Sequence, residues 1–150
     1  MSRNSMASFI VGLTAVAAVG AVTPGRAAAQ SHANLVWKQL EAVYTTAHDQ
    51  GYSTRNYILG KLDEGESDSW TLRLYGGNDY AIIGACDGDC KDVDITVLDD
   101  DGDVVERDTS TDDLPVVEFS LKNTGRYTIK VNMYSCSTEP CYFGMGVFYR

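Results

Sequence analysis

Short segments that alternate apolar and polar residues follow one another through the chain after residue 56, and turn residues separate them. In 116–121, for example, Val117, Phe119 and Leu121 fall on one face. A period of two is that of a β-strand with one buried face. The alternating segments are 57–62, 68–75, 92–98, 104–107, 116–121, 127–133 and 142–149, and one further segment, 79–85, is apolar on both faces, which suits a central strand. About eight strands at this spacing predict a mainly β protein, folded as an antiparallel β-sandwich.

A helical period precedes the strands. Seven residues fall at positions that share one face of a helix: Ala33, Val36, Trp37, Leu40, Val43, Tyr44 and Ala47. This spacing predicts one amphipathic α-helix, and Gln50-Gly51 is a plausible end for it. A connector follows, so that the helix and connector fill residues 30–56 and the sandwich fills residues 57–150. The apolar face is expected to pack on the protein's own core, with docking to a partner as the alternative.

Residues 1–29 have the pattern of a secretory signal peptide. Arg3 supplies a positive charge, the stretch 6–22 is apolar, and 27–29 are three alanines. Small residues of this kind precede a signal-peptidase site, which predicts cleavage before Gln30. An uncleaved membrane anchor is the alternative, but the apolar stretch is short for a span and is interrupted by polar residues and glycines. The protein is therefore predicted to be secreted or periplasmic, with no membrane attachment after cleavage.

The chain is strongly acidic, with a formal net charge of −9. Cleavage would remove Arg3 and Arg26 and no acid, which leaves 10 basic against 21 acidic residues and a net charge of −11. Such a charge opposes binding to nucleic acid and to anionic membranes, and it permits cations and basic partners. A solubilising surface without a specific partner explains the same charge.

Four cysteines form two closely spaced pairs, Cys86 with Cys90 and Cys136 with Cys141. Export favours disulfides over free thiols. Local pairing is favoured because both spacings suit compact loops. Pairing between the two loops stays open, because both loops are expected at the same end of the sandwich. Neither pair has the Cys-x-x-Cys spacing of a redox enzyme, and the spacings fit zinc ribbons poorly.

Several segments between residues 57 and 149 match a family pattern. They are Gly65-Glu66-Ser67-Asp68-Ser69-Trp70, then Asp92-Val93-Asp94-Ile95-Thr96-Val97-Leu98, the turn Asp101-Gly102, and Gly125-Arg126-Tyr127-Thr128-Ile129-Lys130-Val131. With these segments the chain resembles the bacterial pre-peptidase C-terminal (PPC) domain family. The resemblance implies a jelly-roll-like sandwich with a non-catalytic accessory role. Such domains are usually appended to secreted enzymes, whereas here only a helix precedes the domain.

If consecutive strands reverse direction, the loops 63–67, 86–91, 108–115 and 135–141 share one end of the sandwich. Both cysteine pairs and many acids fall there. Four aspartates, Asp87, Asp89, Asp112 and Asp113, are the candidate ligands of a calcium ion, which prefers several oxygen donors. Some members of the resembled family bind calcium through an acidic linker before the first strand, but residues 51–61 contain no acid. The alternative is that these aspartates are solvated turn residues.

Catalytic motifs are absent from the sequence. The chain contains two histidines, His32 and His48, and neither a His-Glu-x-x-His nor a Gly-x-Ser-x-Gly motif. We therefore expect a non-catalytic module that binds a protein, peptide or polysaccharide, with an unknown ligand and calcium as the candidate cofactor. The alternative is a structural or regulatory envelope protein that docks a partner through its helix, at residues such as Trp37 and Leu40. A secreted hydrolase that uses paired carboxylates comes third.

Overall fold

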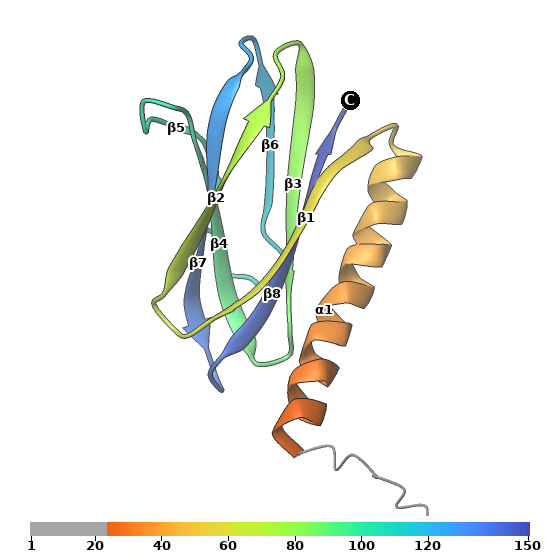
Figure 1. The fold of residues 1–150 in the computed structure, drawn as a ribbon, viewed down its shortest axis with the longest axis vertical. Helices are drawn as coiled ribbons and strands as arrows, with labels where there is room; N and C mark the ends of the chain where they lie inside the picture. The colour runs from red at the N-terminus through yellow and green to blue at the C-terminus, as the bar shows by residue number, and fades with distance from the viewer. Residues whose placement is uncertain (1–23) are drawn as a thin grey trace, which may run out of the picture.

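A computed structural model describes residues 24–150, and in that part of the chain one helix precedes eight strands (Figure 1). The helix is α1 (Pro24–Asp49). The strands are β1 (Ser53–Leu62), β2 (Ser67–Leu74), β3 (Asn78–Cys86), β4 (Cys90–Leu98), β5 (Val104–Asp108), β6 (Val116–Leu121), β7 (Gly125–Cys136) and β8 (Cys141–Tyr149). The predicted fold class, a mainly β sandwich preceded by one helix, is confirmed.

The strands form two antiparallel sheets of four strands each. Sheet A has the order β1-β8-β3-β6, and sheet B has the order β2-β7-β4-β5. Successive strands of the chain pass from one sheet to the other, except β4 and β5, which pair with each other in sheet B. This order is that of a double-sheet jelly roll.

The core lies between the two sheets and is built from the alternating apolar positions. In β7, Ile129, Val131 and Met133 are fully buried, whereas Lys130 between them is exposed. The facing strand β8 buries Phe143, Met145 and Val147 on the same side. Burial of such side chains is worth about 1.5–3 kcal/mol each and is the main contribution to the stability of the sandwich.

Helix α1 lies along the outer face of sheet A, beside β1 and β8 (Figure 1). Val36 and Leu40 are fully buried there, next to Ala85 of β3. The helix approaches β8 most closely at Gly144, where an added Cβ would come within 2.8 Å of both Val36 and Leu40. A glycine at this position therefore allows the helix to lie directly on the sheet, which places its N-terminal half next to the loop between β3 and β4.

Two boundaries differ from the prediction. Strand β1 begins at Ser53, so the predicted connector before residue 57 is partly strand. Helix α1 begins at Pro24, so residues 24–29 of the predicted leader are helical, and the rest of the leader lies outside the described residues. Across residues 24–150, no helix combines the length and the apolar character that a bilayer crossing needs.

Candidate functional site

Four connections lie together at one end of the sandwich, as the alternating strand directions predict. We call them the loop end: residues 63–66, 87–89, 109–115 and 137–140. Hydrogen bonds join them in pairs. The Glu64 amide donates to the Glu139 carboxylate at 3.0 Å, and the Ser137 amide donates to the Asp89 carbonyl at 2.8 Å. Three of the loops, 63–66, 87–89 and 137–140, are therefore joined to one another, and the loop 109–115 is held to β4 beside them by the Val93 amide, which donates to the Asp112 carbonyl at 3.1 Å.

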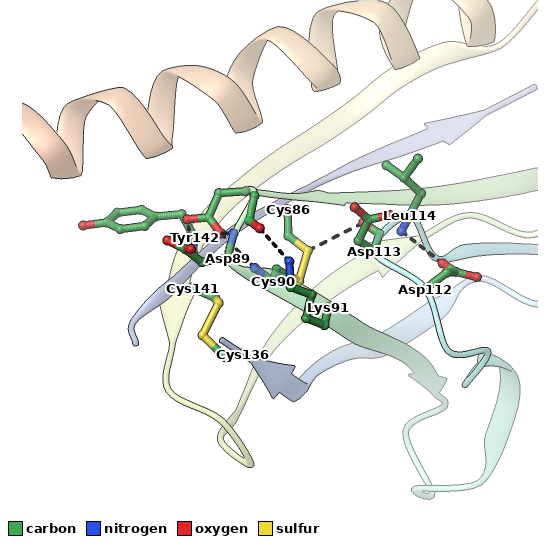
Figure 2. Close-up of a disulfide and its surroundings, with 12 residues drawn as sticks. Cys86, Asp89, Cys90, Lys91, Asp112, Asp113, Leu114, Cys136, Cys141 and Tyr142 are labelled. Carbon is green, nitrogen blue, oxygen red and sulfur yellow. Dashed lines mark hydrogen bonds between the residues drawn. A yellow bond between two sulfur atoms is a disulfide. The ribbon is translucent and has the colours of Figure 1, made fainter. Parts of the chain in front are cut away.

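Two disulfides fix the loop end, and both are local: Cys86 bonds to Cys90, and Cys136 bonds to Cys141. Their Cα–Cα distances are 5.9 and 6.0 Å, within the usual range. The two bridges are neighbours (Figure 2), because Cys90 of β4 stands opposite Cys136 of β7 in sheet B. The alternative, a bridge between the two loops, does not occur in this structure.

The side chain of Asp87 organises the loop between β3 and β4. Asp87 is 1% exposed, and its carboxylate accepts hydrogen bonds from the backbone amides of Asp89 and Cys90, both at 3.2 Å. It also accepts one from the amide of Tyr142 at 3.1 Å, which connects this loop to β8. A buried carboxylate persists in a protein when several donors face it. The bonds to the main chain explain why an acid occupies this buried position.

Helix α1 reaches the same loop through two polar side chains. His32 Nδ1 lies 2.8 Å from Asp87 Oδ2 and 3.8 Å from Asp89 Oδ2. The imidazole ring is stacked on the ring of Tyr142, with 5.8 Å between the ring centres. About two helical turns further along the same side, Gln39 donates to the Cys86 carbonyl at 3.1 Å. The helix is thus joined to the loop end by polar contacts as well as by its apolar face.

The four predicted calcium ligands do not gather at one point. Asp87 and Asp89 lie together, whereas Asp112 and Asp113 lie on the other side of the Cys86–Cys90 bridge (Figure 2). The Asp112 carboxylate accepts a hydrogen bond from the Leu114 amide at 3.0 Å, as in an ordinary turn. In the described part of the chain, the one group of three potential metal ligands combines Asp87 and Asp89 with His32. Sequence analysis did not connect His32 with these acids, because 55 residues separate it from Asp87.

Two other aspartates near the loop end have shifted pKa values. Burial raises the pKa of Asp92, which is 5% exposed, and the negative charges of Asp94 and Asp112 raise it further. One oxygen of the Asp92 carboxyl has no hydrogen-bond partner among the described residues. Asp108 behaves in the opposite way: burial opposes its ionisation, but hydrogen bonds from the Val116 and Ser110 amides outweigh burial and lower its pKa.

Part of the predicted buried face of α1 is exposed. Trp37 and Tyr44 are 42% and 44% exposed, although the helical period places them with Val36 and Leu40. Trp37 packs edge-on against Tyr57 of β1. Together these three aromatic residues line a hollow of about 220 Å³ beside the edge of sheet A. The prediction that the helix docks a partner is thereby limited to this exposed strip, and it stays a prediction.

Comparison with known proteins gives matches among solved structures. No family model and no curated protein matches the chain. Among solved structures, it is similar to Aeromonas hydrophila PliG, a periplasmic lysozyme inhibitor of g-type lysozyme. The TM-score is 0.50 at 12% sequence identity, and the match covers 65% of this chain and 88% of PliG. At this identity the similarity establishes the fold alone. The resemblance to the PPC family stays a prediction.

The loop end carries carboxylates on loops that disulfides and hydrogen bonds hold in place. A catalytic acid needs a raised pKa and access to substrate. Asp92 has the raised pKa but is buried beneath the loops, where a substrate cannot reach it. The exposed acids of the loop end, Asp63, Glu66 and Asp113 among them, instead form a negatively charged rim.

Proposed function

We propose that this protein is an exported, non-catalytic module that binds another protein through the loop end. The proposal rests on one observation: the loop end bears acids on loops that are held in fixed positions. Two disulfides and hydrogen bonds between loops hold it in place before any partner arrives. A surface that is already ordered loses little conformational entropy on binding, which favours affinity.

The partner is expected to be basic. The chain has a net charge of −9, and complementary charge increases association rates and selects partners. PliG, which has a similar fold, is an inhibitor of g-type lysozyme. A lysozyme of the g type is therefore the first candidate partner, and other basic envelope or host proteins come next. Export fits both the disulfides and the predicted leader.

The test measures binding and inhibition with purified lysozymes and pairs two charge variants. The loop-end variant carries Asp63→Asn and Asp113→Asn, two exposed acids whose side chains hold no loop in place. The control carries Asp101→Asn and Asp103→Asn in the turn between β4 and β5, at the opposite end of the sandwich. Both variants change the net charge by the same amount.

The loop-end variant should bind about 2- to 30-fold more weakly at low salt, because an exposed ion pair contributes about 0.2–1 kcal/mol. The control should retain wild-type affinity. Equal losses in both variants would indicate attraction by net charge alone and would contradict a binding site at the loop end. Failure of every basic partner to bind would contradict the proposed function itself.

A further inference from the structure

Three potential metal ligands from two distant segments converge beside the loop between β3 and β4. His32 comes from α1, and Asp87 and Asp89 come from the loop. One ligand atom of each lies within 4.8 Å of the others. We propose that His32 Nδ1, Asp87 and Asp89 bind a divalent transition-metal ion of the zinc class, which connects the helix to the loop end.

The charges at this point are not balanced by the protein. The single Nδ1 atom of His32 can donate to one carboxylate at a time, and it is directed at Asp87. The carboxylate of Asp89 has no hydrogen-bond partner among the described residues, and its negative charge lies close to that of Asp87. Lys91, two residues after Asp89 in the sequence, donates to the Gly88 carbonyl at 2.9 Å. A divalent cation between the three ligands would neutralise both carboxylates.

The spacing of the ligand atoms fits a small ion. Zinc bonds of about 2.0–2.1 Å at tetrahedral angles place ligand atoms about 3.3 Å apart. The two distances from His32 Nδ1, 2.8 and 3.8 Å, lie on either side of that value. The ligand oxygens of Asp87 and Asp89 lie within 4.8 Å of each other, so the Asp89 carboxylate would move toward Asp87 and the ion would replace the His32–Asp87 hydrogen bond. The His32 and Asp89 side chains are about one-third exposed, at 35% and 33%, which leaves an entry path and an open position for water.

The hydrogen bonds around Asp87 resemble those that orient the ligands of a metal site. Its other oxygen, Oδ1, is held by the amides of Asp89 and Cys90. Hydrogen bonds of this kind orient a ligating carboxylate before the ion binds. The Cys86–Cys90 disulfide closes the loop that carries both aspartates. Because the main chain already fixes Asp87, most of the site exists before the metal arrives.

The donor set selects the class of ion. Imidazole nitrogen with carboxylate oxygen suits zinc and its neighbours in the transition series. Calcium prefers six to eight oxygen donors, and this site supplies two carboxylates and a nitrogen. The inference therefore differs from the predicted calcium site in its ion and in its residues, since His32 takes the place of Asp112 and Asp113. It is independent of the proposed binding function.

The experiment uses the untagged mature chain, residues 30–150, treated with a chelator and titrated with Zn²⁺ by isothermal titration calorimetry. Co²⁺ absorption in the visible range serves as a second probe, because it reports the coordination geometry. We expect saturable binding of one ion per chain. His32→Ala and Asp89→Asn should each weaken binding at least 10-fold, and neither residue holds the loop in place. Asp87→Asn is avoided because the loop depends on that side chain.

Two matched controls separate this site from adventitious binding. His48→Ala removes the other histidine of α1, and Asp113→Asn removes an exposed acid of the loop end. Both should bind Zn²⁺ as the wild type does. The inference is overturned if the wild type shows no saturable binding, if His32→Ala and Asp89→Asn bind normally, or if His48→Ala alone abolishes binding. Zn²⁺ binding is measured without a protein partner. The metal site can therefore fail while the proposed protein-binding function holds, and the reverse.

Discussion

Replacing Leu40 by alanine tests whether α1 is an integral part of the fold. Leu40 is fully buried, and its Cδ1 atom lies close to the backbone of Gly144 in β8. The substitution removes three carbon atoms, worth about 2.4 kcal/mol at about 0.8 kcal/mol per buried methylene. A cavity adds to this loss, although Leu40 also borders the exposed hollow beside Trp37, so the site can partly close. We expect a total of about 2–4 kcal/mol.

Urea unfolding can measure this loss with two tryptophan reporters, Trp37 on α1 and Trp70 on β2. The matched control is Leu35→Ala, because Leu35 is on the same helix but 43% exposed, and its removal should cost less than about 1 kcal/mol. If both variants lose equally little, the helix contributes no core packing and the reasoning fails. If only the helical circular-dichroism signal moves to lower urea, α1 unfolds separately from the sandwich. The same result bears on docking: a charged residue at Leu40 would disrupt folding, so Trp37 is the position that reports on a partner.

Three further predictions concern ionisation and the disulfides. Because burial raises the pKa of Asp92, its ionised form opposes folding, so stability falls as pH rises from about 4 through the raised value. Asp92→Asn should therefore stabilise the protein by at least about 1 kcal/mol at pH 7 and have no effect at pH 3, measured by thermal unfolding. The lowered pKa of Asp108 has the opposite sign: the ionised carboxylate stabilises the fold above pH 4, and that stability is lost on acidification. Asp108→Asn should cost about 1 kcal/mol at pH 7, and a variant as stable as the wild type would show that the bonds to Ser110 and Val116 contribute nothing. Replacing Cys136 and Cys141 together by serine should cost about 2 kcal/mol, the chain-entropy value for a loop with a sequence separation of 5, and a change below 0.5 kcal/mol would contradict it.

Most strands could be located from the sequence because buried and exposed positions alternate along them, as in β6 and β7, whereas β3 and β8 are buried on both faces. The segment 116–121 coincides with β6, whose alternation is complete. The start of β1 was missed for a physical reason. Residues 53–56 are polar, lie in an edge strand paired on one side with β8, and include an irregularity in register between Thr54 and Asn56. The order of strands in the sheets was not predictable, because a period of two identifies a face but not a neighbour.

The apolar face of α1 that the sequence predicts to be buried is wider than the face that sheet A covers. The period places Trp37 and Tyr44 with Leu40, but sheet A covers only a narrow stripe centred on Val36, Leu40 and Ala47. The width of that stripe depends on how the helix is laid across β8, and Gly144 determines how closely it approaches. These are tertiary contacts, which the helical period of the sequence does not predict. The position of His32 has the same origin: it meets Asp87 only because the helix crosses the sheet in this direction.

Many carboxylates of the loop end hold the loops together in addition to carrying negative charge. Loops leave backbone amides without strand partners, and acidic side chains satisfy them. Five acids are used in this way: Glu64 for the Cys136 amide, Glu66 for Asp63, Asp87 for Cys90, Asp112 for Leu114 and Glu139 for Glu64. The acidic composition of these loops is therefore explained first by the loops' need for hydrogen-bond acceptors, without any ligand. Asp63 and Asp113 are exposed acids whose side chains hold no loop in place, so neutralising these two tests binding at this end without loosening the loops.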